Sequence, residues 1–117
     1  MTIRVLVVDD DEDIRTILRL LLEGEGYCVA LAANGREALD RVAERPPRLV
    51  LLDLHMPEMS GWEAHQRLRE QRAAIPVVFM TAGEHARREA DRHGADGFLA
   101  KPFELADVLR TIERFVA

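Results

Sequence analysis

The chain of 117 residues has a single cysteine and no long apolar run, and each shortage narrows the functions open to it. One cysteine, Cys28, excludes an internal disulfide and a zinc site of several thiolates, which favours a reducing compartment. We expect Cys28 to be a small buried side chain in a strand. No apolar stretch approaches the length of a membrane span, and the first eight residues carry no signal-peptide cleavage site. We therefore predict a cytoplasmic protein without membrane contact.

An excess of positive charge is also lacking, because the formal net charge is -5. This argues against direct binding of nucleic acid, which selects a basic surface. The basic residues are arginines with one exception, Lys101. Chance is one explanation; the other is a position that needs a compact ammonium on a flexible stem. The length suits one domain, and no linker or low-complexity segment divides it, so we predict a single domain over residues 1–117.

Strand patterns and helix patterns alternate along the chain. Short apolar runs predict the strands Ile3–Val8, Cys28–Ala32, Leu49–Leu54, Ile75–Met80 and Gly97–Ala100. Helical spacing after the first strand marks Ile14, Ile17, Leu18, Leu21 and Leu22 as inward-facing, and in the last helix it marks Leu105, Val108, Leu109, Ile112, Phe115 and Val116. A helix is also expected between the Asn34-Gly35 turn or cap and Pro46-Pro47, with Ala38, Leu39, Val42 and Ala43 on one face. Two more are expected from about Gly61 to Gln71 and at Glu84–His93. The alternation predicts an α/β fold with a parallel sheet and helices on both faces.

Polar side chains follow the predicted strands where each strand ends. Asp9 and Asp10 follow the first, Asp53 ends the third, Thr81 follows the fourth and Lys101 the fifth. In an open parallel sheet, ligands bind beyond the carboxyl ends of the strands. Neighbouring carboxylates need a cation, and oxygen ligands favour Mg²⁺. Thr81 and Lys101 are donors, which suit an anion beside the metal and indicate a phosphoryl group.

Four motifs at these strand ends resemble those of one family. Val-Asp-Asp-Asp, Leu-Asp-Leu-His-Met-Pro, Met-Thr-Ala and Lys-Pro-Phe, in this order, are similar to the receiver domain of two-component response regulators. The resemblance extends from Ile3 to Phe115. It implies a doubly wound, flavodoxin-like three-layer sandwich whose five-stranded sheet has the order 2-1-3-4-5. It also implies a cis peptide bond between Lys101 and Pro102.

The resemblance further implies roles for these residues. Asp53 would be the phosphoacceptor, taking a phosphoryl group from the phosphohistidine of a histidine kinase or phosphotransfer protein. Asp10, Asp53 and the backbone carbonyl of His55 would bind Mg²⁺ directly, and Asp9 largely through water. Thr81 and Lys101 would contact the phosphoryl oxygens. Such a domain is not a turnover enzyme, although it assists its own phosphorylation and dephosphorylation.

Phosphorylation would act on a surface made by the fourth helix, the fifth strand and the fifth helix. Thr81 and an aromatic side chain, here Phe98, would switch this surface, which would meet a downstream protein, a fused output domain or a second copy in a homodimer. The chain is then either a stand-alone receiver or part of a larger regulator. Two alternatives remain: a receiver-like scaffold without phosphorylation, which the intact site disfavours, and an Asp-nucleophile phosphatase, disfavoured because it needs an acid where His55 stands.

Plainer readings apply to several residues. Acids at a helix start are the alternative for Asp9, Asp11, Glu12 and Asp13, and we prefer it for Asp11 to Asp13. Thr81 suits a helix cap, and Phe98 suits the core. We expect His55, His65, His85 and His93 to be surface histidines, Trp62 to be partly buried, and Met56 and Met59 to pack. The helix Glu84–His93 offers only Ala86 and Ala90 as apolar side chains, so we expect weak anchoring. The chain departs from the family pattern in the slightly short span from Thr81 to Lys101 and in Phe98, where the family often has a tyrosine. His55 and Gly83 fall at positions where side chains in the family adjust the lifetime of the acyl phosphate, and Gly83 has no side chain.

Overall fold

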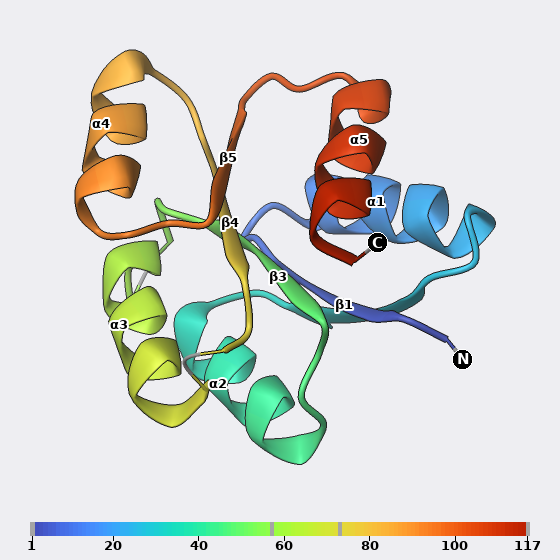
Figure 1. The fold of residues 1–117 in the computed structure, drawn as a ribbon, viewed down its shortest axis with the longest axis horizontal. Coiled ribbons are helices and arrows are strands. Elements are labelled where there is room, and N and C mark those ends of the chain that lie inside the picture. The colour runs from blue at the N-terminus through green and yellow to red at the C-terminus, as the bar shows by residue number, and fades with distance from the viewer. Residues whose placement is uncertain (1, 57, 73, 117) are drawn as a thin grey trace.

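The computed structural model describes residues 2–56, 58–72 and 74–116, in which strands and helices alternate (Figure 1). The strands are β1 (Arg4–Val8), β2 (Cys28–Ala32), β3 (Leu49–Asp53), β4 (Val77–Thr81) and β5 (Gly97–Ala100). The helices are α1 (Glu12–Gly24), α2 (Gly35–Glu44), α3 (Gly61–Arg72), α4 (Glu84–Arg92) and α5 (Leu105–Val116). Pro57 of the Leu-Asp-Leu-His-Met-Pro motif lies outside the described residues.

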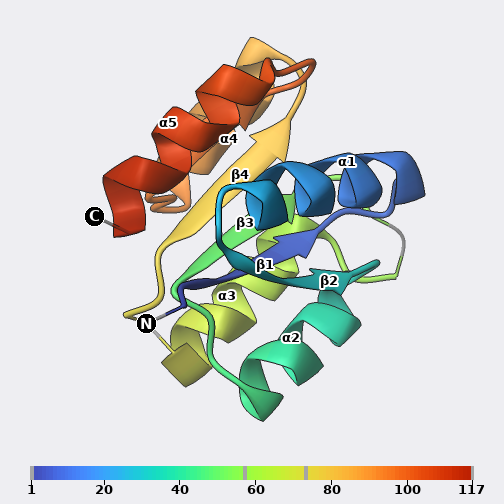
Figure 2. The ribbon, with the colours of Figure 1, turned by 90° about the vertical axis from the view of Figure 1, so that its right-hand side faces the viewer.

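The strands form one parallel sheet of order β2-β1-β3-β4-β5, which confirms the predicted topology. Helices α2, α3 and α4 cover one face and α1 and α5 the other, so the fold is the expected three-layer sandwich (Figures 1 and 2). Strand β3 is in the middle of the sheet. Because helices cover both faces there, every residue of β3 is buried. None of the described helices combines the length and the apolar character that crossing a membrane requires.

Side chains of the central strands alternate between two cores. The core under α2, α3 and α4 takes Leu6, Val8, Val50, Leu52 and Phe79 from the sheet. The core under α1 and α5 takes Val5, Val7, Leu49, Leu51, Val78 and Met80. This alternation follows from the two-residue period of a strand, and it explains why β1, β3 and β4 are nearly continuous aliphatic runs.

Local capping fixes where the first two helices begin. The Asp11 carboxylate accepts hydrogen bonds from the backbone N–H groups of Asp13 (2.9 Å) and Ile14 (3.4 Å), which confirms that this acidic stretch starts a helix. At α2, the Asn34 side chain accepts from the Glu37 N–H at 2.9 Å. The Glu37 carboxylate reaches back to the Ala33 N–H at 2.9 Å, so the two side chains cap the helix reciprocally. These caps hold the turns that follow β1 and β2.

Some expected positions were wrong. Ile17 and Leu105 were expected to face inward, but they are 50% and 45% exposed. The buried stripes are narrower than the sequence spacing indicated, since α1 buries Leu18 and Leu22 fully while Ile17 falls at the stripe's edge. Cys28 lies in a strand as predicted, but it is only half-buried because β2 is an edge strand with a single neighbour.

His65 was predicted to be a surface histidine and is instead buried, with 3% of its surface exposed. Its ring meets the edge of Phe79 at a centroid distance of 4.9 Å, and its Nε2 accepts a hydrogen bond from Arg69 Nε at 3.1 Å. Burial, and secondarily the Arg69 charge, lower the pKa of His65 below its ordinary value. The neutral His65 ring is suited to a buried position, because one side of it packs on Phe79 and its Nε2 has a hydrogen-bond partner.

Helix α4 is attached by contacts that its sequence did not indicate. Its one fully buried apolar side chain among the described residues is Ala90, and the side chain of Ala86 lies outside them. The His93 ring, directly after the helix, stacks on Trp62 of α3 with centroids 4.4 Å apart. Arg69 donates to the Gly94 carbonyl at 3.2 Å and to the Asp96 carboxylate at 2.7 Å. Ring and ionic contacts to α3 therefore supplement the small apolar area of α4.

Candidate functional site

The predicted site residues meet at the carboxyl edge of the sheet. Asp9 follows β1 and is fully buried, Asp53 ends β3 with 4% exposure, and Thr81 ends β4 with 1% exposure. Lys101 follows β5. Because β3 lies between β1 and β4, its last residue stands at the centre of this edge. The order of the sheet thus gathers residues that are up to 92 positions apart in the chain.

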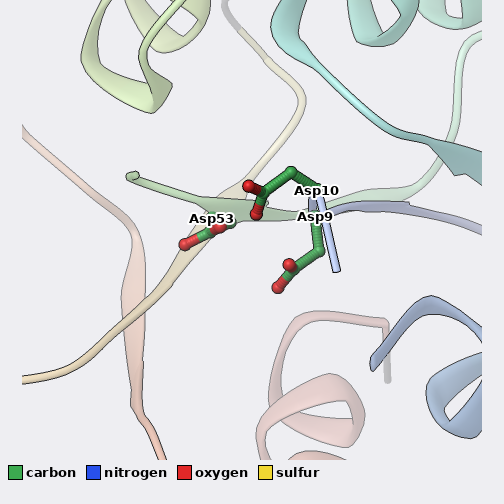
Figure 3. Close-up of side chains that lie close together, drawn as sticks. All are labelled: Asp9, Asp10 and Asp53. Carbon is green, nitrogen blue, oxygen red and sulfur yellow. The ribbon is translucent and has the colours of Figure 1, made fainter. Parts of the chain in front are cut away.

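Three carboxylates converge at this edge. Figure 3 shows the side chains of Asp9, Asp10 and Asp53 close together, with Asp53 at the end of β3 and the other two in the turn after β1. One carboxylate oxygen from each lies within 4.8 Å of the others. Asp10 is exposed whereas Asp9 and Asp53 are buried, so the cluster opens to solvent on the Asp10 side.

Lys101 neutralises part of this charge. Its Nζ forms an ion pair with Asp9 Oδ2 at 2.7 Å and a longer one with Asp53 Oδ1 at 3.5 Å. Burial by itself lowers the pKa of Lys101, but the hydrogen bond and charge of Asp9, together with Asp53, outweigh it and raise the pKa above its ordinary value. The ammonium therefore stays charged between two buried carboxylates. This placement accounts for the one lysine in an arginine-rich chain.

Asp53 is held in an unfavourable electrostatic environment. Burial, followed by the charge of Asp9, raises its pKa from 3.8 to about 6, against the lowering effects of Lys101 and the His55 N–H. The His55 N–H donates to Asp53 Oδ1 at 3.4 Å, while the His55 side chain is exposed. Asp9 likewise accepts one N–H, from Asp11 at 2.9 Å, but the raised pKa of Asp53 indicates that one ammonium and these two N–H groups do not fully compensate for the burial of two carboxylates. The site therefore favours an added cation.

The Thr81 hydroxyl has no partner in the described part of the chain. Its Oγ1 is buried and makes no hydrogen bond to the described residues, although buried hydroxyls are normally paired. The alternative role as a helix cap is not seen, because α4 begins after Gly83 without a side-chain capping bond. The Thr81 carbonyl accepts from the Lys101 N–H at 2.8 Å, and the Lys101–Pro102 peptide bond is cis, as the resemblance implied. A donor beside Lys101 is thus left available for a ligand.

Two residues that the sequence reasoning missed support the carboxylates. Arg15 donates from NH1 to the backbone carbonyl of Asp9 at 2.8 Å, which places a second cation near the cluster. Gly61 lies against the end of β3, where an added methyl group would collide with the Asp53 carbonyl and come within 2.6 Å of the Leu54 Cα. A glycine at the start of a helix, soon after a functional strand, was the available signal for this close approach.

Phe98 lies away from the carboxylates, on β5. It is half-buried and packs against the core under α2, α3 and α4, so the core interpretation holds for part of its ring. The Arg87 guanidinium of α4 lies 5.9 Å from the ring centroid. Phe98 therefore joins α4 to β5 at the surface where the resemblance placed a switch.

The comparisons with known proteins agree with this geometry. The response regulator receiver domain family matches residues 5–113, so the chain belongs to this family, which is consistent with two-component signalling. It is 43% identical over 111 residues to the response regulator MprA of Mycolicibacterium vanbaalenii and 44% identical over 117 residues to the transcriptional regulatory protein ZraR of Escherichia coli O157:H7. These matches cover 93% and 98% of this chain.

The matched regulators are longer than this chain. The aligned segments span 48% of MprA and 26% of ZraR, but 88% of an uncharacterized 14.6 kDa protein of Leptolyngbya boryana that is 38% identical. Among solved structures, the chemotaxis protein CheY4 of Vibrio cholerae superposes with a TM-score of 0.92 at 32% identity, covering 99% of this chain and all of that one. NtrX of Brucella abortus gives 0.93 at 31% identity with 27% of its length covered. This fold therefore occurs both in a protein of about the same length, CheY4, and as one part of a longer protein, NtrX.

Proposed function

We propose that this receiver domain accepts a phosphoryl group on Asp53, with Mg²⁺, from the phosphohistidine of a histidine kinase or phosphotransfer protein. The observation that carries the proposal is the position of Lys101 Nζ, 2.7 Å from Asp9 and 3.5 Å from Asp53 within a cluster of three carboxylates. A cluster that served stability alone would not bury two carboxylates against a single ammonium. An acceptor for a charged group needs this arrangement of charge.

The residues fit a magnesium ion. Three carboxylate oxygens lie within 4.8 Å of one another, and burial, followed by the charge of Asp9, raises the pKa of Asp53. Asp10 and Asp53, with the backbone carbonyl of His55, would hold the ion directly, and Asp9 through water. The ion would neutralise the carboxylates and the equatorial oxygens of the transferred group.

The chain's own residues then position the reaction. A carboxylate oxygen of Asp53 attacks phosphorus, the bond from phosphorus to the donor's imidazole nitrogen breaks, and that nitrogen keeps the electron pair. The Lys101 ammonium pairs with one phosphoryl oxygen, and the unpartnered Thr81 hydroxyl donates to another. With a pKa of about 6, Asp53 is mostly ionised at neutral pH and ready to act as nucleophile.

The signal would leave through α4, β5 and α5. A hydrogen bond from Thr81 to the phosphoryl group pulls the loop after β4 toward the site and shifts α4, whose one fully buried apolar side chain among the described residues is Ala90 and whose Arg87 lies over the Phe98 ring. That surface would bind a downstream protein or a fused output domain, as expected for a domain whose relatives are in part longer regulators.

The test is phosphoryl incorporation from acetyl phosphate, followed by intact mass spectrometry. The protein should gain the mass of one phosphoryl group with Mg²⁺ and none in EDTA, and Asp53→Asn should abolish the gain because the nucleophile is gone. Asp40→Asn is the matched control, since Asp40 is an exposed carboxylate on α2.

Two results would contradict the proposal. A full gain in Asp53→Asn would assign the acceptor elsewhere. The second result is a folded, unmodified protein that gains no mass although Mg²⁺ and acetyl phosphate are present. This would favour the alternative of a scaffold that is not phosphorylated.

A further inference from the structure

The opposite end of the sheet has a basic hollow. It measures about 190 Å³ and is lined by two segments, Thr2–Arg4 at the start of β1 and Arg45–Arg48 between α2 and β3. Figure 2 shows the start of the chain beside the loop that leads into β3. Three arginines and no carboxylate line it. We call it the amino-edge hollow.

The arginines of the amino-edge hollow differ from most others in the protein. No hydrogen bond or ion pair joins the side chains of Arg4, Arg45 or Arg48 to the described residues. Elsewhere, described arginines pair with carboxylates or carbonyls or lie over aromatic rings, as do Arg15, Arg19, Arg41, Arg67, Arg69, Arg87, Arg92, Arg110 and Arg114. In a chain with more acidic than basic residues, three unpaired guanidinium groups in one place indicate an anion as partner.

Arg4 supplies a second indication. Its Nε is buried and has no acceptor among the described residues. A buried donor without a partner costs on the order of 1–3 kcal/mol, more for a charged group, so this N–H calls for an acceptor. Arg4 lines the hollow, so an anion bound there would lie against the side chain that carries this donor.

The backbone around the hollow is held in place. The Arg48 N–H donates to the Arg4 carbonyl at 2.8 Å, which ties the two lining segments together, and the Arg45 N–H closes α2 on the Arg41 carbonyl at 3.1 Å. Between them Pro46 and Pro47 fix their own φ angles, and Pro47 is buried. Binding therefore requires ordering of side chains but little ordering of the loop.

We propose that the amino-edge hollow binds a phosphate-class oxyanion, and that it holds a diphosphate more tightly than a single phosphate. Three guanidinium forks match several phosphate oxygens at once, and a diphosphate presents more charge and more oxygens than one phosphate. The hollow's volume of about 190 Å³ is more than ten times the ~10–15 Å³ that admits one water, so it has room for a group larger than water. This site lies at the other end of the sheet from Asp53 and does not depend on the phosphoacceptor function.

The test is an NMR titration of the ¹⁵N-labelled protein in EDTA at constant ionic strength. The probes are inorganic phosphate, inorganic diphosphate and ADP. We expect saturable shifts confined to the amides of Ile3, Arg4, Arg45 and Arg48, with diphosphate binding tighter than phosphate. ADP binding tighter than diphosphate would identify a nucleoside diphosphate as the ligand, and equal affinity would show that the phosphates alone are recognised.

The variants separate this site from general charge attraction. Arg45→Gln with Arg48→Gln should weaken diphosphate binding at least about tenfold, because two of three forks are lost. Arg36→Gln removes an exposed arginine of α2 whose side chain also has no partner among the described residues, and it should leave binding unchanged. The proposal is overturned if no probe gives saturable shifts up to roughly 10 mM, well above the ~1 mM of weak binding. It is equally overturned if Arg36→Gln weakens binding as much as the double variant does.

Discussion

The two ends of the parallel sheet carry opposite charges in different environments. At the carboxyl ends, Asp9 and Asp53 are buried, lie near one another and share the ammonium of Lys101. At the amino ends, Arg45 and Arg48 are exposed in a short loop and have no partner among the described residues. Charges at the first end are coupled through a poorly screened interior, whereas those at the second are screened by water.

This difference in burial predicts how much the charged groups at each end of the sheet contribute to stability. A buried charge that loses its partner costs several kcal/mol or so, while an exposed one that is removed changes stability by a few tenths. Equivalent substitutions should therefore have large effects at the carboxyl edge and small effects at the amino-edge hollow, and the following predictions test this contrast in order of size.

The largest effect is expected for Lys101→Met. In the described chain Lys101 is the only side chain that forms an ion pair with Asp9 or Asp53. Its loss leaves two buried carboxylates facing each other, and we expect the free energy of unfolding at pH 7 in EDTA to fall by about 3 kcal/mol. Urea denaturation measures this.

Mg²⁺ should restore part of the stability of Lys101→Met, because a divalent cation replaces the lost charge. Arg36→Gln, which removes a charge from an exposed helix position, is the control and should change stability by less than about 0.5 kcal/mol. Equal losses in the two variants would show that the carboxyl edge is not coupled as described.

A smaller effect of opposite sign is expected for Asp53→Asn. The folded protein raises the pKa of Asp53 from 3.8 to about 6, so the native state binds more protons than the unfolded state between these values. Stability from this group is present below pH 3.8 and is lost as the pH rises through 6. At pH 7 in EDTA, the asparagine variant should therefore be more stable than the unmodified protein by at most about 3 kcal/mol, at ~1.4 kcal/mol for each pKa unit.

The advantage of Asp53→Asn should disappear below about pH 4, where the carboxyl is protonated in both states. It should also shrink in Mg²⁺, which stabilises only the protein that binds it well. Parallel urea titrations from pH 4 to pH 7 measure the difference between the two proteins. If the difference in unfolding free energy between the two proteins does not change from pH 4 to pH 7, burial and the neighbouring charges do not raise the pKa of Asp53.

The sheet and the carboxyl edge were largely predictable from the sequence. Continuous aliphatic runs can be buried only in a central parallel strand, and the last residue of such a run must lie at the edge where ligands bind. The strand pattern alone therefore predicts that Asp9, Asp53, Thr81 and Lys101 lie at one edge of the sheet, whereas the order of the strands was predicted from the resemblance. The structure places them at one edge, while their roles in phosphorylation stay predictions.

Burial of polar side chains on helices was not predictable. His65 has the composition of a surface residue, and only the three-dimensional meeting of α3 with Phe79 and Arg69 explains why it is inside. Ile17 failed in the other direction, because helical spacing marks a broad apolar stripe but not which edge of it the sheet covers. The amino-edge hollow was not predicted, because Arg4 lies more than forty positions before Arg45 and Arg48 in the chain.

The smallest effect is expected for Arg45→Gln at the amino-edge hollow. Its guanidinium is exposed and has no partner among the described residues, so the free energy of unfolding should change by less than about 0.5 kcal/mol in buffer without phosphate. Added diphosphate should raise the melting temperature of the unmodified protein more than that of the variant, because only the native state holds all three arginines around the anion. Thermal melts with and without diphosphate measure both quantities. A loss of 2 kcal/mol or so in plain buffer would show that Arg45 is coupled to the fold as strongly as Lys101 is, and the contrast between the two ends of the sheet would fail.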